Sequence, residues 1–203
     1  MSSDRTGVRQ SILDTAKPII LGKGFSAVGL NEILVAAAVP KGSFYHYFKS
    51  KELFGEALLD SYFRDYLEQL DALLSDPSRT AAERLMSYWQ KWLQMQASDG
   101  LEGKCLAVKL GGEVSDLSEP MRMALHRGTD QIIDRLALSI REGIADGSLS
   151  ASLDARHIAQ TLYQLWLGAT LLTKFRQDRS ALDGAMLATL DWLQLPACAA
   201  SPG

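Results

Sequence analysis

Cysteines are few in this sequence, and it has no long hydrophobic run. The two cysteines, Cys105 and Cys198, lie far apart, which argues against a disulfide framework and predicts two reduced thiols. The first residues lack the apolar core of a signal peptide. The longest run without a charged side chain, His157 to Thr173, contains two glutamines and is shorter than the roughly 20 apolar residues that span a membrane. These absences favour a cytoplasmic protein with no membrane partner.

The sequence also lacks strand-like alternation, internal repeats and the residue spacings of a catalytic or metal site. Apolar residues instead recur every three or four positions, which predicts an all-α fold. His126 and His157 lie in helical patterns, without a nucleophile elbow or a metal-ligand spacing. The alternative is a thiol-dependent enzyme in which Cys105 pairs with one histidine and Glu113 or Asp116 orients it, and the helical setting disfavours it. We therefore expect no enzymatic activity, no cofactor and no metal.

Charge is unevenly distributed along the chain. Residues 1–52 hold 7 Lys and Arg against 4 Asp and Glu, a net charge of +3. Residues 53–203 hold 14 against 20, a net charge of −6. The total of −3 argues against a protein that binds a polyanion over its whole surface. A basic N-terminal module therefore precedes an acidic body.

Helical patterns divide the basic module into short segments. The spacing of apolar residues predicts a first helix over about residues 6–22, which Pro18 should kink or split because proline lacks the amide donor. A second helix is predicted over about residues 30–37, and Ser50 is the predicted N-cap of a long helix over about residues 51–74. We therefore expect three short helices before a long one.

Residues 40–48 form the third of these short helices, and their composition is unusual for a helix that only fills a core. Phe44 and Phe48, four residues apart, predict a face that anchors the helix. Two short helices joined by a tight turn, the second one polar, are the plan of a DNA-binding helix-turn-helix. A small aromatic core is the alternative, which the basic surroundings disfavour. The predicted DNA-binding residues supply hydrogen-bond donors, positive charge or a close backbone approach: Lys41, Gly42, Ser43, Tyr45, His46, Tyr47, Lys49 and Lys51.

Residues 8–54 resemble the N-terminal domain of the TetR family of transcriptional repressors. Gly24-Phe25 stands before the second helix, and residues 41–48 match the family's recognition-helix pattern K-G-(S/T)-(F/L)-Y-x-(H/Y)-F. Lys51-Glu52-Leu53 matches the start of the family's fourth helix. The resemblance implies a homodimer that binds a pseudo-palindromic operator in double-stranded DNA. Its two recognition helices would then lie about 34–36 Å apart, one turn of the duplex.

The domain organisation follows from the charge pattern and from this resemblance. We predict a three-helix helix-turn-helix DNA-binding domain over residues 1–50, a larger helical ligand-binding and dimerisation domain over residues 51–195, and a disordered tail over residues 196–203. Ser118 and Asp154 are predicted N-caps in the second domain. The helices predicted there cover about residues 82–97, 106–114, 118–145, 154–176 and 181–195.

The predicted helix over residues 154–176 is apolar nearly all round. One face carries Tyr163, Leu167, Thr170 and Lys174, and the opposite face carries Leu162, Leu165, Ala169 and Leu172. A helix with two buried faces needs two packing partners, and one of them can be another subunit. The resemblance implies the same arrangement, because the last two long helices of TetR-like proteins pair across a two-fold axis into a four-helix bundle.

Cys105 is the candidate sensor of the second domain. It stands where a helix is predicted to begin, just after Gly103 and beside Lys104, with Lys109 one turn further on. A helix N-terminus and nearby ammonium groups both stabilise a thiolate, which is the reactive form of cysteine. The alternative is that this cysteine is a small buried side chain of the core.

A second resemblance bears on this cysteine. Residues 103–122 and 163–169, together with Lys174, resemble the NemR-like repressors, which respond to reactive electrophiles and oxidants. The resemblance implies that Cys105 is the sensor and that Lys174 lies near it. Some of these repressors carry a second cysteine where this chain has Ser115. The prediction is therefore a single-thiol mechanism, which is alkylation, a sulfenic acid or a bond to a nearby amine.

A reversible hydrophobic effector is the alternative to a covalent one. The candidate pocket would be lined mainly by aromatic side chains of the second domain: Trp89, Trp92, Tyr163, Trp166 and Thr170. Aromatic stripes at helical spacing are more often core than ligand contacts. The sequence alone leaves both classes of effector open.

Overall fold

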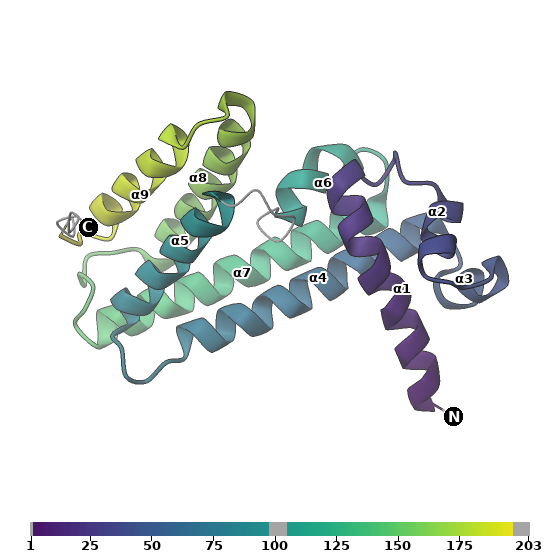
Figure 1. The fold of residues 1–203 in the computed structure, drawn as a ribbon. Coiled ribbons are helices and arrows are strands. Elements are labelled where there is room, and N and C mark those ends of the chain that lie inside the picture. Colours follow the sequence, from purple (N-terminus) through teal and green to yellow (C-terminus); the bar gives the residue numbers. More distant parts are fainter. Residues whose placement is uncertain (1, 98–104, 197–203) are drawn as a thin grey trace. The chain divides into compact units, whose positions relative to one another are not determined.

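The structure, a computed structural model, describes residues 2–97 and 105–196. Every regular element within these two ranges is a helix (Figure 1), which confirms the predicted all-α class. The chain forms two compact units, one from residues 1–66 and 100–129 and one from residues 67–99 and 130–203. The long helices α4 (Lys51–Leu74) and α7 (Glu119–Ala145) each contribute to both units. No helix in the described ranges is apolar over a stretch long enough to cross a membrane.

The first unit contains the predicted DNA-binding module. Its other helices are α1 (Ser2–Lys23), α2 (Leu30–Ala36), α3 (Lys41–Phe48) and α6 (Leu106–Val114). Helix α1 packs against α2, and α2 packs against α3 (Figure 1). The module is therefore a chain of neighbouring helices, and the same unit also includes α6, which lies much later in the sequence.

Helix α1 departs from the sequence prediction. It is one helix of 22 residues that continues through Pro18, so of the predicted kink or split the split did not occur, and the prediction of three short helices was wrong. Pro18 is exposed, whereas Ile12, Ala16 and Ile20 are fully buried along the opposite side of the helix. Burial of that apolar face offsets the roughly 3 kcal/mol that a proline costs inside a helix, because tertiary packing supplies most of the stability of a helix in a protein.

The predicted helix caps are confirmed. Ser50, Ser118 and Asp154 each accept a hydrogen bond from the backbone N–H three residues further on, at 3.1, 3.4 and 3.1 Å. Each bond satisfies one of the amides that a helix leaves unpaired at its start. The last helix, α9 (Ser180–Trp192), ends earlier than predicted, because Gln194 adopts a positive φ of 55° that cannot continue a helix.

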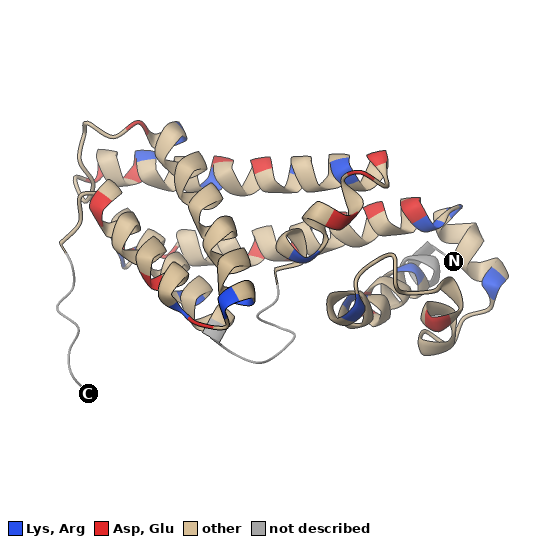
Figure 2. Ribbon diagram, turned by 90° about the horizontal axis from the view of Figure 1, so that it is seen from above, with Lys and Arg blue, Asp and Glu red and all other residues tan. Residues whose placement is uncertain are grey.

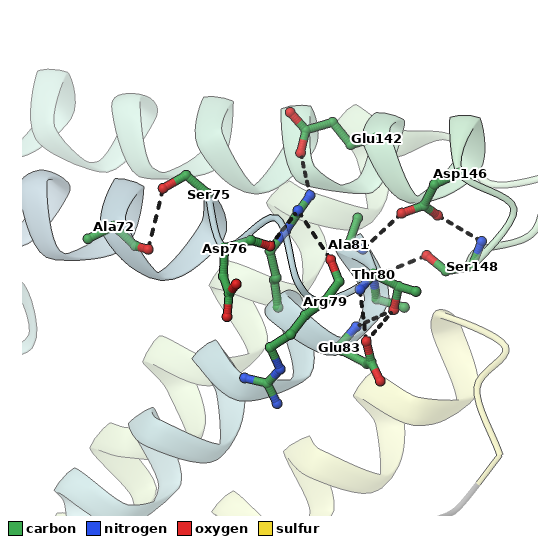
Figure 3. A network of polar contacts seen from close by, with 12 residues as sticks. Ala72, Ser75, Asp76, Arg79, Thr80, Ala81, Glu83, Glu142, Asp146 and Ser148 are labelled. Atoms are coloured by element: carbon green, nitrogen blue, oxygen red, sulfur yellow. Dashed lines mark hydrogen bonds and ion pairs between the residues drawn. The ribbon is translucent and has the colours of Figure 1, made fainter.

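In the second unit, the start of α5 (Ala81–Ala97) is held by residues that lie much later in the chain (Figure 3). The Asp146 carboxylate accepts from the Ala81 N–H at 2.9 Å, and the Ser148 hydroxyl accepts from the Ala82 N–H at 3.2 Å. Thr80 accepts from the third amide of the helix. All three amides at the start of α5 therefore have acceptors, which fixes this end of the helix against the turn that follows α7.

Charged side chains join α4 and α7 within each unit. Acidic residues predominate on α4, and α7 carries both arginines and acidic residues; Figure 2 marks the two signs of charge along the ribbon. Arg127 lies 3.2 Å from Glu56 and 3.1 Å from Asp60 in the first unit. Arg135 lies 3.0 Å from Asp71 in the second. Because such exposed pairs contribute only about 0–1 kcal/mol each, they orient the two helices more than they stabilise them.

Helix α8 (Ala155–Arg176) packs beside α9 in the second unit (Figure 1). Its buried arc is centred on Trp166 and takes residues from both of the faces predicted to oppose each other, such as Leu162 and Thr170. Three further apolar side chains of α8 are exposed: Leu171 at 41%, Leu172 at 40% and Phe175 at 70%. The packing of the single chain therefore covers one arc of the helix, and the prediction of a second packing partner, which can be another subunit, stays a prediction.

Candidate nucleic-acid interface and regulatory site

Helix α3 is anchored by phenylalanines. Phe44 and Phe48 are 0% and 3% exposed, and Phe54 at the start of α4 is fully buried. Their ring centroids lie 5.1 to 5.3 Å from one another, which is the usual distance for interacting aromatic rings. The cluster holds one face of α3 on its module, as the spacing predicted, and leaves the other face free for contact with another molecule.

The other face of α3 carries the predicted DNA-binding side chains. Tyr45 is 43% exposed, and Lys41, Gly42, His46 and Lys49 are exposed as well. The Lys41 ammonium nitrogen lies 5.9 Å from the centre of the Tyr45 ring, so a positive charge stands beside the phenol. Hydrogen-bond donors and positive charge thus share one exposed surface of a short helix.

The remaining predicted DNA-binding residues are less available. Ser43 and Tyr47 are half-buried. Lys51 donates a hydrogen bond to the Phe25 carbonyl oxygen at 3.0 Å, and its nitrogen lies 4.8 Å from the centre of the Phe25 ring. The ammonium group of Lys51 is therefore engaged inside the module, which the sequence did not reveal because its partner is 26 residues away.

Sequence reasoning missed the structural role of Glu113. Its carboxylate accepts hydrogen bonds from the backbone N–H groups of Phe25, at 3.1 Å, and Ser26, at 2.6 Å. Burial raises the pKa of the carboxyl, but the hydrogen bonds from Ser26 and Phe25 outweigh it and leave the pKa lowered. No local signal could have indicated this contact, because it joins α6 to the turn between α1 and α2, 87 and 88 residues away.

Cys105 stands at the N-cap of α6 and is half-buried. The Tyr62 hydroxyl donates to the Cys105 sulfur at 3.8 Å. The Lys17 ammonium nitrogen lies 5.5 Å from the centre of the Tyr62 ring, so a positive charge lies one side chain away from the thiol. Lys109 is half-buried and donates its backbone N–H to the Cys105 carbonyl at 2.9 Å. The sulfur therefore lies at a helix start, against a hydrogen-bond donor.

The predicted sensor also includes Gly103, Lys104 and Lys174. Gly103 and Lys104 lie outside the described residues, as do Cys198 and residues 197–203 of the predicted tail. Lys174 lies in the last turn of α8, in the second unit, and is half-buried. Tyr62 was not singled out from the sequence, because an aromatic residue in a long amphipathic helix carries no sign of its partner.

The five candidate pocket residues lie together in the second unit. The Trp89 and Trp166 rings stack with centroids 5.1 Å apart, and the Trp92 indole N–H donates to the Thr170 hydroxyl at 3.0 Å. Tyr163 packs against Trp92 with ring centroids 5.9 Å apart. Each of the five is less than a tenth exposed, so they form a packed aromatic cluster. Within the described ranges the Trp89 indole nitrogen is buried without a hydrogen-bond partner.

Comparison with known protein families accounts for most of the chain. Residues 12–58 match the family described as bacterial regulatory proteins, tetR family. Residues 81–189 match the family described as Tetracyclin repressor-like, C-terminal domain. The first match covers the helix-turn-helix and the start of α4, and the second covers the helices from α5 into α9.

Individual proteins resemble the chain along nearly its whole length. It is 38% identical over 189 residues to the HTH-type transcriptional repressor NemR of Escherichia coli strain K12, covering 93% of this chain and 95% of NemR. It is 34% identical over 179 residues to the HTH-type transcriptional repressor DhaR of Mycobacterium sp. strain GP1, covering 88% of each. The crystal structure of E. coli NemR in its reduced form superposes with a TM-score of 0.87 at 39% identity, covering 94% of this chain and 99% of that one.

Proposed function

The chain belongs to the TetR family of bacterial transcriptional regulators, and from this premise we propose that it is a repressor that leaves its operator when an electrophile or oxidant modifies Cys105. The observation that carries the sensing half of the proposal is the setting of Cys105, whose sulfur accepts from the Tyr62 hydroxyl at the N-cap of α6. The observation that carries the DNA-binding half is the division of α3 into a buried phenylalanine face and an exposed polar face.

Operator recognition falls to the exposed face of α3. Tyr45 and His46 donate to base edges or phosphates, and Lys41 and Lys49 supply charge to the phosphates. Lys51 acts from within the module, where it holds Phe25. Fluorescence anisotropy with DNA from upstream of the protein's own gene tests this assignment. Replacement of Tyr45 by Ala should weaken binding about tenfold, and unchanged binding would contradict the assignment.

We further propose a homodimer formed through α8 and α9. Phe175 and Leu187 are 70% and 66% exposed on these two neighbouring helices, and Leu171 is 41% exposed. Exposed apolar side chains on adjacent helices favour a protein partner, and a two-fold axis makes the same patch serve both copies. A dimer would present two α3 helices to the two halves of a pseudo-palindromic operator.

The sensing reaction we propose is addition of the Cys105 thiolate to an electron-poor alkene. A carbon–sulfur bond forms as the carbon–carbon π bond opens, and the neighbouring carbon takes a proton from water. The Tyr62 hydroxyl donates to the sulfur and orients it. An oxidant of the hypochlorous acid class would instead convert the thiolate to a sulfenic acid with release of chloride. Either product adds bulk or polarity at the start of α6. The crystal structure of NemR, which is 39% identical to this chain, is described as its reduced form. That description supports the proposal that the oxidation state of a thiol matters in this chain too.

Intact-mass measurement tests the covalent proposal. Treatment with a stoichiometric amount of N-ethylmaleimide should add one label at Cys105 and release operator DNA. Cys105→Ser should retain DNA under the same treatment, while Cys198→Ser should respond like the wild-type protein. Release of DNA from Cys105→Ser would contradict the covalent sensor, as would wild-type protein that is labelled at Cys105 and still holds its operator.

A reversible hydrophobic effector is the second candidate, and one observation favours it. The Trp89 indole N–H is fully buried without a hydrogen-bond partner in the described part of the chain, so an oxygen of a small aromatic or carbonyl ligand would satisfy it. Such a ligand would displace packed side chains between Trp89 and its neighbours. Quenching of tryptophan fluorescence without any change in intact mass, together with release of DNA, would favour this effector over a covalent one.

Two further parts of the proposal follow from the family. The known relatives are transcriptional regulators, and no relative described above is an enzyme. Glu113 is engaged by the amides of Phe25 and Ser26, which removes one of the two orienting groups of the thiol-enzyme alternative. A regulator that binds operator DNA acts where the chromosome is, so we propose a cytoplasmic location.

A further inference from the structure

We propose that Glu113 is a positioning residue for operator binding, because its carboxylate holds the turn that connects α1 to the helix-turn-helix. The turn comprises residues 24–26, and we call it the module turn. Glu113 lies one residue before the end of α6. No residue of α6 belongs to the exposed face of α3, so this contribution to DNA binding is indirect. It fixes the orientation of α1 relative to α2, and α2 in turn packs against α3.

The geometry of the contact is specific. One carboxylate oxygen of Glu113 accepts from the Phe25 N–H at 3.1 Å, and the other accepts from the Ser26 N–H at 2.6 Å. Gly24 adopts a φ of 93°, and a Cβ at that position would lie 3.0 Å from one of these oxygens. Glycine therefore serves twice here, since it allows the positive φ and leaves room for the carboxylate. Charge-assisted bonds to two successive amides are the kind that fix orientation as well as add energy.

The module turn is held from its other side by Lys51. The Lys51 ammonium group donates to the Phe25 carbonyl oxygen and lies over the Phe25 ring. Phe25 is therefore bound through its N–H by α6 and through its C=O by α4. A negative and a positive side chain grip the same residue, so the turn has a defined place relative to both helices. Loss of Glu113 would leave Phe25 held by α4 alone.

Helix α6 joins this contact to Cys105. Leu106, Leu110 and Val114 are fully buried and form one stripe along the helix. Cys105 and Glu113 stand at opposite ends of it, about 12 Å apart at 1.5 Å per residue. A group added at Cys105 would shift the start of a short helix whose far end grips the module turn. This coupling, unlike the positioning role itself, rests on the proposed sensing at Cys105.

Glu113→Gln provides a sharp test, because a positioning role and simple electrostatics predict opposite changes in the affinity for the operator. Removal of a negative charge should by itself raise affinity for DNA of any sequence. Loss of positioning should instead lower affinity for the operator, by about tenfold, while affinity for unrelated DNA stays level or rises. Glu119→Gln is the matched control, since Glu119 lies in the same unit in an exposed pair with Arg122. Its operator affinity should be unchanged or slightly higher. An operator affinity of Glu113→Gln equal to that of the control would overturn the proposal.

Hydrogen exchange at the Phe25 and Ser26 amides separates positioning from a general loss of stability. Both amides should exchange at least about tenfold faster in Glu113→Gln, while the Ile12 and Ile20 amides of α1 stay protected. Faster exchange throughout the first unit would mean that the variant is merely unstable. Glu113→Asp, which keeps the charge but is shorter by one methylene, should then bind the operator as weakly as Glu113→Gln. If it instead binds as the wild type does, the positioning role is wrong.

The coupling has its own measurement, which separates its failure from failure of the proposed sensing. Wild-type protein labelled with N-ethylmaleimide should show faster exchange at Phe25 and Ser26 as it loses operator affinity. Loss of the operator with unchanged exchange at these amides would overturn coupling through Glu113 and leave the sensor intact. Retention of the operator after labelling would contradict the sensor, while the Glu113→Gln comparison would still decide the positioning role.

Discussion

Helices α3 and α8 both leave one side exposed, but the two sides differ in chemistry. The exposed side of α3 carries Tyr45, His46 and lysines, whereas that of α8 carries Leu171, Leu172 and Phe175. Polar donors and positive charge suit the binding of DNA, which is a hydrated polyanion. Such binding is reversible, because counterions and water can take the place of the DNA phosphates when the DNA is released. Apolar side chains suit a protein surface that stays bound. The comparison separates the two proposed partners, DNA for α3 and a second copy of the chain for α8.

The largest expected effect is on the buried side of α3. Phe44→Ala removes a fully buried ring from the cluster with Phe48 and Phe54, which should destabilise the protein by about 3–5 kcal/mol and abolish operator binding. Chemical denaturation and anisotropy would measure both losses. Tyr45→Ala, on the exposed side of the same helix, should change stability by less than about 0.5 kcal/mol. Equal destabilisation by both variants would contradict the division of α3 into a buried anchoring face and an exposed DNA-binding face.

The next effect concerns the exposed side of α8. Phe175→Glu should weaken the proposed dimer at least about tenfold, roughly 1.4 kcal/mol, because it places a charge in an apolar contact. Sedimentation equilibrium over a range of concentrations would measure the change. Gln90→Glu adds the same carboxylate to an exposed position of α5 and should leave the assembly unaltered. An unchanged dimer in Phe175→Glu would assign the α8 surface to some other role.

A smaller effect is expected from single charges on α3. Lys49→Ala should weaken binding to operator and to unrelated DNA alike and should lower the slope of log affinity against log salt by about 1, because one phosphate contact is lost. Anisotropy titrations at several salt concentrations measure the slope. Lys91→Ala, on an exposed position of α5, is the control. A loss confined to the operator would mean that Lys49 reads bases rather than phosphates.

The smallest expected effect is a pH-dependent change in stability in the second unit, outside α3 and α8. Hydrogen bonds from the Ser148 side chain and from the Ala81 and Ser148 amides lower the pKa of Asp146. A lowered pKa stabilises the fold at neutral pH, and the contribution is lost as pH falls through the folded-state value. Asp146→Ala should therefore lower the melting temperature at pH 7. The difference should begin to shrink below about pH 4 and should vanish once the pH is below the folded-state pKa. Asp116→Ala, at another exposed aspartate, should show no such difference, and a difference that persists in acid would contradict the assignment.

Local signals in the sequence were sufficient for the helix starts and for α3. Ser50, Ser118 and Asp154 were predicted as caps because a cap and the amide it accepts from are three residues apart. Phe44 and Phe48 were predicted as an anchoring face because they are four residues apart on one helix. In both cases the interacting groups lie within about one helical turn, so the spacing alone contains the geometry.

Distant partners account for what the sequence did not predict. Pro18 was expected to kink or split α1, but burial of Ile12 and Ile20 against the rest of the unit keeps the helix from splitting. Lys51 was assigned to DNA, but Phe25 engages it. The predicted sensing role of Cys105 and the domain boundary at residue 50 stay predictions, because neither burial nor helix packing reports on reactivity or on independent folding.

The sequence by itself determined the helical class, the family and the likeness of residues 41–48 to a recognition helix, because periodicity and motif spacing are properties of neighbours in the chain. Only the tertiary structure decided which side chains meet across it. Glu113 meets the amides of Phe25 and Ser26, and Tyr62 meets Cys105, over separations of 43 to 88 residues. Such contacts depend on how helices pack, and packing is decided by the burial of whole faces rather than by any single spacing.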